Sequence, residues 1–202
     1  MKEPAGRWLG SLILALSLSA VILAWIIIGA SWYLNSSWFV FTRNAFSDLG
    51  GPRSCCPQLY NYGLMAVGAL IVAAGIAMGR ASQSLLEAWG SAYLALAGVF
   101  LGLIGYYYEG TRPHVFVSTW FFIQMDVALA LLSAGLARRG SSLARLSLIV
   151  ALEAFPVAAL IGVLVGWPSA ATLEAYGVVL IDFMVLVVSY EYYRQYRMER
   201  AA

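Results

Sequence analysis

Seven polar residues outside or at the ends of the long apolar stretches form the strongest candidate binding site of the chain. They are Arg43, Asn44, Ser47, Asp48, Asn61, Arg112 and His114. Arginine binds phosphate through paired hydrogen bonds, and histidine gains or loses a proton near neutral pH. We therefore predict that this set binds a phosphate-bearing lipid headgroup, with His114 and Asp48 as candidate acid–base groups. Because no nucleophile next to a base can be named from the spacing, the catalytic residues stay unknown.

The same residues also have a structural interpretation. Asp48 stands in the sequence Ser-Asp-Leu-Gly-Gly, which suits a turn whose carboxylate accepts hydrogen bonds from backbone amides. Arg43 and Arg53 would then contact lipid phosphates at the membrane surface, and His114 would begin a helix. The sequence leaves both interpretations open.

A second group of ionisable residues lies inside three of the apolar stretches. Asp126, Glu153 and Asp182 each follow the start of their stretch by about 10 to 12 residues, which at about 1.5 Å per residue places them near the bilayer centre. Charged carboxylates at that depth cost several kcal/mol, so they normally pair, stay protonated or face the bundle interior. We predict one shared polar cavity, with Gln124 above it, that relays protons, binds a cation or receives a polar group of a substrate. The alternative is that each carboxyl is neutral and hydrogen-bonds a neighbouring helix.

The two cysteines, Cys55 and Cys56, are adjacent in the sequence. Only a strained ring could join them, and strained disulfides are labile. We expect free thiols or a vicinal bridge without a catalytic role. The chain has one histidine, and a Cys-Cys pair lacks the ligand spacing of a structural zinc site. The sequence therefore predicts no metal and no cofactor.

The elements that must position these residues are membrane helices. Of 202 residues, 62% are hydrophobic and 11% are charged, whereas soluble domains carry about 25% charged residues. Apolar stretches of about 20 residues are long enough to cross a hydrocarbon core of about 30 Å. We predict an all-α membrane protein, a bundle of six transmembrane helices that forms one integral membrane domain over residues 1–202. The expected spans are about 8–32, 60–79, 87–108, 114–137, 143–166 and 171–192.

The distribution of basic residues orients this bundle. With six spans both termini lie on one side, and nine of the twelve basic residues share it: Lys2, Arg7, Arg80, Arg138, Arg139, Arg145, Arg194, Arg197 and Arg200. The other side has Arg43, Arg53 and Arg112. The positive-inside rule therefore predicts a multi-pass protein of the cell membrane with cytoplasmic N- and C-termini. Its expected partners are membrane lipids and other membrane subunits, and a net charge of +2 gives no reason to expect nucleic acid.

Residues 35–49, between the first two spans, are predicted to form a short interfacial helix in the first outward loop. Its apolar stripe consists of Trp38, Phe41, Ala45 and Leu49. A serine at position 36 or 37 would cap its start, and Gly50-Gly51-Pro52 would end it. We expect the other polar loops on this side, near residues 109–114 and 167–169, to assemble against this loop.

Several of these residues carry a resemblance to a known family. The run RNAFSDLG at residues 43–50, PQLYNYGL at 57–64, and Pro113-His114 followed by Trp120-Phe121-Phe122 resemble the domain-of-unknown-function family 998 of archaeal and bacterial integral membrane proteins. More distantly, the Ser-Asp-Leu-Gly loop after the first span is similar to the eukaryotic Frag1, DRAM and Sfk1 group, of which some members are linked to lipid remodelling or autophagy. The resemblance implies a six-span fold and a shared outward polar site. It implies no reaction, and the adjacent cysteines are not part of the pattern.

Three functions are compatible with this sequence. The first is a lipid-interacting or lipid-processing membrane protein that holds a headgroup with Arg43, Asp48 and His114. The second is a proton- or cation-coupled transporter that uses the three carboxylates within the membrane. The third is a non-enzymatic subunit of a larger membrane complex. The sequence does not decide whether the protein is an enzyme.

Overall fold

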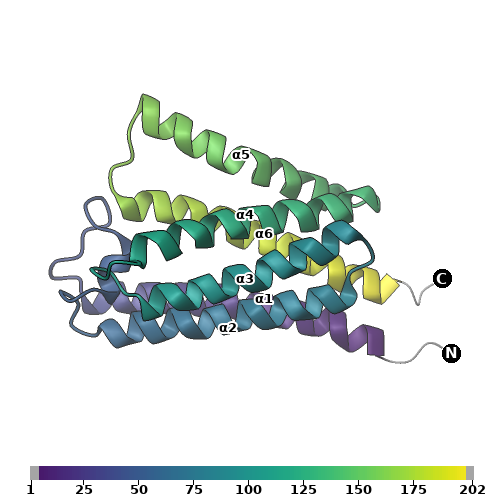
Figure 1. Cartoon of the computed structure of the whole chain (residues 1–202), viewed down its shortest axis with the longest axis horizontal. Helices are drawn as coiled ribbons and strands as arrows, with labels where there is room; N and C mark the ends of the chain where they lie inside the picture. The colour runs from purple at the N-terminus through teal and green to yellow at the C-terminus, as the bar shows by residue number, and fades with distance from the viewer. Residues whose placement is uncertain (1–4, 199–202) are drawn as a thin grey trace.

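The structure is a computed structural model that describes residues 5–198, and this part of the chain contains six long helices and no strand (Figure 1). The helices are α1 (Ala5–Leu34), α2 (Pro57–Ala81), α3 (Leu85–Tyr106), α4 (His114–Arg138), α5 (Ser142–Leu164) and α6 (Ala170–Met198). Each contains at least 22 residues that are apolar enough to cross a membrane. The predicted all-α fold with six transmembrane helices is therefore confirmed, and each helix overlaps one of the expected spans.

The helices run up and down, so that the connections gather at two ends (Figure 1). Residues 35–56, 107–113 and 165–169 lie at one end, which we call the three-loop end. The beginning of α1, the end of α6 and the short connections 82–84 and 139–141 lie at the other, which we call the terminal end. Helix α5 lies at the edge of the bundle and diverges from α4 and α6 toward the three-loop end (Figure 1).

Most of the basic residues that determined the predicted orientation lie near the terminal end. The described ones on this side are Arg80, Arg138, Arg139, Arg145 and Arg194. Lys2 and Arg200 lie outside the described residues, as do the side chains of Arg7 and Arg197. The orientation of the bundle in the membrane stays a prediction.

Glycines bring α2 and α3 into close contact. A Cβ on Gly68 would lie 2.5 Å from the carbonyl oxygen of Gly98, and a Cβ on Gly98 would lie 2.7 Å from the carbonyl oxygen of Gly68. Only hydrogen atoms fit in that space, so the two backbones touch directly, as small residues allow in membrane bundles. This pair forms the closely packed side of the bundle, away from α5 (Figure 1).

The first outward loop is less helical than the sequence predicts. Its only helix among the described residues is η1 (Phe46–Gly50), a single 3₁₀ turn that ends at the expected glycines. Residues 35–44 form turns instead, because Asn44 accepts a hydrogen bond from the amide of Val40 and Asn35 accepts one from the amide of Cys55. Asparagine side chains that bind nearby backbone groups compete with helix formation. The predicted single helix over residues 35–49 is therefore wrong in extent.

At the terminal end a buried carboxylate holds three helices together. Glu87 near the start of α3 is fully buried and accepts hydrogen bonds from Arg139 at 3.2 Å, from the hydroxyl of Tyr192 at 3.0 Å and from Ser84 at 2.9 Å. These donors come from the end of α4, from α6 and from the N-cap of α3. A buried charge that is paired and hydrogen-bonded in this way fixes the positions of its neighbours.

Candidate functional site

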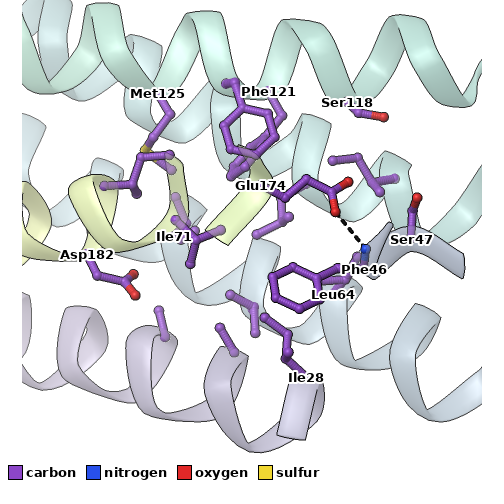
Figure 2. Close-up of a pocket in the computed structure, with 18 of the residues that line it drawn as sticks. Ile28, Phe46, Ser47, Leu64, Ile71, Ser118, Phe121, Met125, Glu174 and Asp182 are labelled. Atoms are coloured by element: carbon purple, nitrogen blue, oxygen red, sulfur yellow. Dashed lines mark hydrogen bonds between the residues drawn. The ribbon is translucent and has the colours of Figure 1, made fainter. Parts of the chain in front are cut away.

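The first outward loop is hydrogen-bonded to the beginning of α6. The hydroxyl of Ser169 donates to the carbonyl oxygen of Phe41 at 2.6 Å, and the amide of Ala171 donates to the carbonyl oxygen of Asn44 at 2.9 Å. The amide of Phe46 donates to Glu174 Oε2 at 2.6 Å, which is the dashed line in Figure 2. These three bonds tie residues 41–46 to α6 and fix the position of η1 against it.

Asp48, Asn44 and Asn61 stabilise the loop itself. Asp48 Oδ2 accepts hydrogen bonds from the amide of Ala45 at 2.9 Å and from Asn44 Nδ2 at 3.1 Å, which caps η1. Asn61 Nδ2 donates to the carbonyl oxygen of Gly50 at 2.9 Å. The contacts of Asp48 match its structural interpretation as a carboxylate that accepts hydrogen bonds in a turn. A ligand-binding role for these three residues stays a prediction.

His114, at the first position of α4, is buried and lies between two acceptors. Its Nδ1 is 2.7 Å from the carbonyl oxygen of Tyr107, and its Nε2 is 2.9 Å from Glu109 Oε2. A carbonyl oxygen can only accept, so Nδ1 carries a proton. The contact between Nε2 and Glu109 then needs a second proton, held on the imidazole or on the carboxyl group. Ser47 also donates to Glu109 Oε2, at 3.4 Å, so the pair connects η1 to the loop that precedes α4.

A central cavity of about 110 Å³ lies beneath this pair (Figure 2). Most of its wall is apolar, and its polar lining residues are Ser47, Tyr60, His114, Ser118, Glu174 and Asp182. Glu174 and Asp182 point into it from α6, eight residues apart, which is about 12 Å along the helix. The indole of Trp25 on α1 donates to Asp182 Oδ2 at 2.7 Å. The cavity therefore offers two separate carboxyl groups rather than one shared site.

A larger groove of about 550 Å³ lies between α4, α5 and α6, where α5 diverges. Aliphatic and aromatic side chains form most of its wall, and the aromatic ones are Phe122, Phe155, Trp167 and Tyr176. Its carboxyl groups belong to Asp126 and Glu174, and no Lys, Arg or His is among its lining residues. Asp126 Oδ1 is shielded from solvent without a hydrogen-bond partner in the described part of the chain. We call this cavity the lateral groove.

The three intramembrane carboxylates do not share a cavity in the described part of the chain, contrary to the prediction. Asp126 lines the lateral groove, Asp182 lines the central cavity, and Glu153 is exposed on α5 away from both. Helix α5 packs on α4 through small residues such as Ser147, which hydrogen-bonds Ser133 at 2.7 Å, and Glu153 lies on the opposite face. Gln124 is buried, and its Oε1 has no described partner.

The arginines of the predicted site lie outside both cavities. Arg43 and Arg112 are exposed, and neither forms an ion pair with a described residue. Arg53 places its guanidinium 4.7 Å from the ring centre of Trp38. Of the predicted set, His114 lines the central cavity, whereas Arg43 and Arg112 line neither cavity, and their joint binding of a phosphate stays a prediction.

Sequence reasoning missed Glu174, the one carboxyl group that lines both cavities among the described residues. Glu174 is the fifth residue of α6, close to the beginning of the expected sixth span, and we expected no binding residue there. Its spacing of eight from Asp182 was the available signal, because residues seven or eight apart lie on the same side of a helix.

Comparison with known proteins places this architecture in a family. The family model described as Protein of unknown function (DUF998) matches residues 18–191. The chain belongs to the DUF998 family. No curated protein and no solved structure matches it.

All residues that line the two cavities lie within the matched region of this DUF998 protein. The matched region also contains Cys55 and Cys56, which are exposed and free, with their sulfur atoms 3.4 Å apart. The hydrogen bond to Cys56 is the main reason that the pKa of the Cys55 thiol is raised. The cysteines lie outside both cavities, so we leave them out of the candidate site.

Proposed function

We propose that this DUF998 protein binds a membrane lipid and holds its hydrocarbon chain in the lateral groove. The observation that carries the proposal is the size and lining of the groove, about 550 Å³ with mostly apolar and aromatic walls. The groove lies between helices long and apolar enough to cross a membrane, so lipid chains are the medium that surrounds it. An apolar cavity next to lipid is favourably filled by a chain, because an empty one loses dispersion contacts.

The headgroup would lie at the three-loop end, next to the beginning of α6. Trp167 and Leu173 line the groove there, and hydrogen bonds from Ser169 and Ala171 hold the loop that contains Arg43 nearby. The exposed guanidinium of Arg43 is available for a lipid phosphate. His114 has a smaller part in this proposal than the sequence suggested, because Glu109 and Tyr107 occupy both of its ring nitrogens. By the positive-inside rule this end faces out of the cytoplasm.

A photoactivatable phospholipid with its reactive group on the acyl chain tests the proposal. In membranes we expect it to label peptides of α4, α5 and α6 that line the groove. Ala158→Trp, which places a bulky ring in the groove, should reduce this labelling to background. Ala92→Trp on the exposed face of α3 is the matched control and should leave it unchanged. Equal labelling of the wild type and Ala158→Trp at the groove peptides would refute the proposal.

A second candidate function, proton- or cation-coupled transport, has separate support. Glu174 and Asp182 line one cavity, and His114, with its Nε2 2.9 Å from Glu109 Oε2, lies at its three-loop side. Acids spaced along one cavity are typical of proton pathways in membrane proteins. Proton flux into vesicles with a trapped pH dye tests this candidate. Asp182→Asn should abolish a flux that the wild type supports, and the absence of flux in the wild type would exclude proton coupling.

A further inference from the structure

The outer face of α5 carries an unusual carboxylate. Glu153 is the twelfth of the 23 residues of α5, and it is exposed and forms no hydrogen bond or ion pair with any described residue. The basic residue of α5, Arg145, lies eight residues away, or about 12 Å along the helix. A carboxylate exposed to lipid chains near the centre of a span costs several kcal/mol. This face is therefore poorly suited to lipid.

The residues around Glu153 follow the spacing of a helix–helix seam. The exposed residues of this face are Leu146, Ile149, Glu153, Pro156, Leu160 and Val163. Their separations are three, four, three, four and three, the repeat that keeps one face of a helix against a partner helix in left-handed packing. Single polar residues in such a seam set register and the number of helices. This seam is distinct from the face of α5 that lines the lateral groove.

We propose that a second copy of this chain covers the seam, so that the protein forms a dimer in the membrane through α5. Two copies inserted in the same direction are related by a two-fold axis along the membrane normal, which brings each residue to its counterpart at equal depth. Glu153 then meets Glu153. Two carboxyl groups in contact share a proton, since one of them donates a hydrogen bond and the other accepts it.

A second polar group lies at the same level. Pro156 has no amide hydrogen, so the carbonyl of Leu152 cannot accept the usual hydrogen bond from residue 156. A protonated Glu153 of the facing helix is a donor at the right depth. No described Lys or Arg lies near the middle of any span. The polar group that a second copy contributes at this depth is therefore its Glu153 carboxyl.

Cysteine cross-linking in vesicles of phosphatidylcholine and phosphatidylglycerol tests the dimer. In a background with Cys55→Ser and Cys56→Ser, Leu160→Cys on the seam should form a disulfide-linked dimer on oxidation. Ile26→Cys on α1 is an equally exposed control, with 59% exposure against 56% for Leu160. It should stay monomeric. Cross-linking at position 26, or none at position 160, would overturn the proposal.

Charge at position 153 gives a second, independent readout. Glu153→Gln retains a donor and an acceptor and should leave the cross-linked fraction within about twofold of wild type, whereas Glu153→Lys should lower the association constant about tenfold. Equal dimerisation of Glu153→Lys and Glu153→Gln would contradict the shared proton. Ala158→Trp should leave cross-linking unchanged, so failure of the lipid proposal and failure of the dimer can be told apart.

Discussion

Two carboxylates on opposite ends of the bundle differ in almost every contact. Glu87 at the terminal end is fully buried, and Arg139, Tyr192 and Ser84 all donate to it. Glu174 at the three-loop end accepts a hydrogen bond from one backbone amide, and both cavities open beside it. A polar group satisfied on all sides stabilises a fold, while one that borders empty space is available to a ligand or a proton.

The packing around the two carboxylates differs in the same way. A Cβ on Gly135 of α4 would lie 2.6 Å from Cγ of Glu87, so the helices there leave no room for a methyl group. At the other end α5 diverges and leaves the lateral groove. The hydrogen bonds to Glu87 hold α3, α4 and α6 together at the terminal end, so α5 can diverge at the three-loop end while the rest of the bundle stays packed.

Removal of the Glu87 carboxylate should have the largest effect on stability. Glu87→Ala leaves Arg139 and the hydroxyl of Tyr192 without their acceptor, and loss of one partner of a buried ion pair costs about 3–5 kcal/mol. We expect the free energy of unfolding in detergent, measured by tryptophan fluorescence during chemical denaturation, to fall by this amount. A change below about 1 kcal/mol would show that this cluster does not hold the terminal end.

A methyl group at Gly135 should have the next largest effect. Gly135→Ala forces Glu87 and Ser84 to move, and overpacking of this kind costs about 1–3 kcal/mol. In the groove, a Cβ on Gly162 would lie 3.5 Å from Trp167, which is ordinary contact. Gly162→Ala should therefore leave the melting temperature almost unchanged. Both melting temperatures are measured by thermal unfolding in the same detergent. Equal destabilisation by the two changes would show that the two ends do not differ in packing.

Glu174→Gln should destabilise the fold much less than Glu87→Ala. The amide oxygen can still accept the hydrogen bond from Phe46, so we expect a loss of about 1 kcal/mol or less. The variant should nevertheless change lipid labelling or proton flux, because Glu174 borders both cavities. Denaturation and labelling of the same variant distinguish these two effects. A large loss of stability with unchanged labelling would show that Glu174 has a structural role.

The smallest effect concerns Cys55, which lies at the three-loop end but lines neither cavity. Because the hydrogen bond to Cys56 raises its pKa, the thiolate fraction at neutral pH is below that of an ordinary thiol and grows as the pH rises through the raised pKa. Maleimide should therefore label Cys55 slowly at pH 7 and faster at higher pH. In Cys56→Ala the labelling at pH 7 should accelerate while the melting temperature stays constant. A rate that does not depend on residue 56 would contradict the hydrogen bond.

The sequence predicted the fold better than the site. Six apolar stretches with arginines at their ends were enough for the helices, because length and hydropathy alone decide whether a helix can cross a membrane. Equal depth placed Asp126, Glu153 and Asp182 at one level, but it could not give the direction in which each side chain points. That direction depends on the small-residue face of α5 at Ser147, which turns Glu153 outward.

The sequence also could not predict the hydrogen-bond partners of polar side chains that lie far apart along the chain. The hydrogen bond between Glu174 and Phe46 joins residues of α6 and the first outward loop that are far apart in the sequence, so no local pattern specifies it. Asp48 is the opposite case, because its partners Ala45 and Asn44 are three and four residues away. Its capping role could be expected from a local turn motif.

Native mass spectrometry of the protein released from lipid nanodiscs tests the lipid proposal most directly. The wild type should retain one lipid molecule under conditions that strip loosely bound lipid, Ala158→Trp should retain none, and Ala92→Trp should behave as the wild type. Retention of the same lipid by the wild type and Ala158→Trp would show that the lateral groove is not the lipid site.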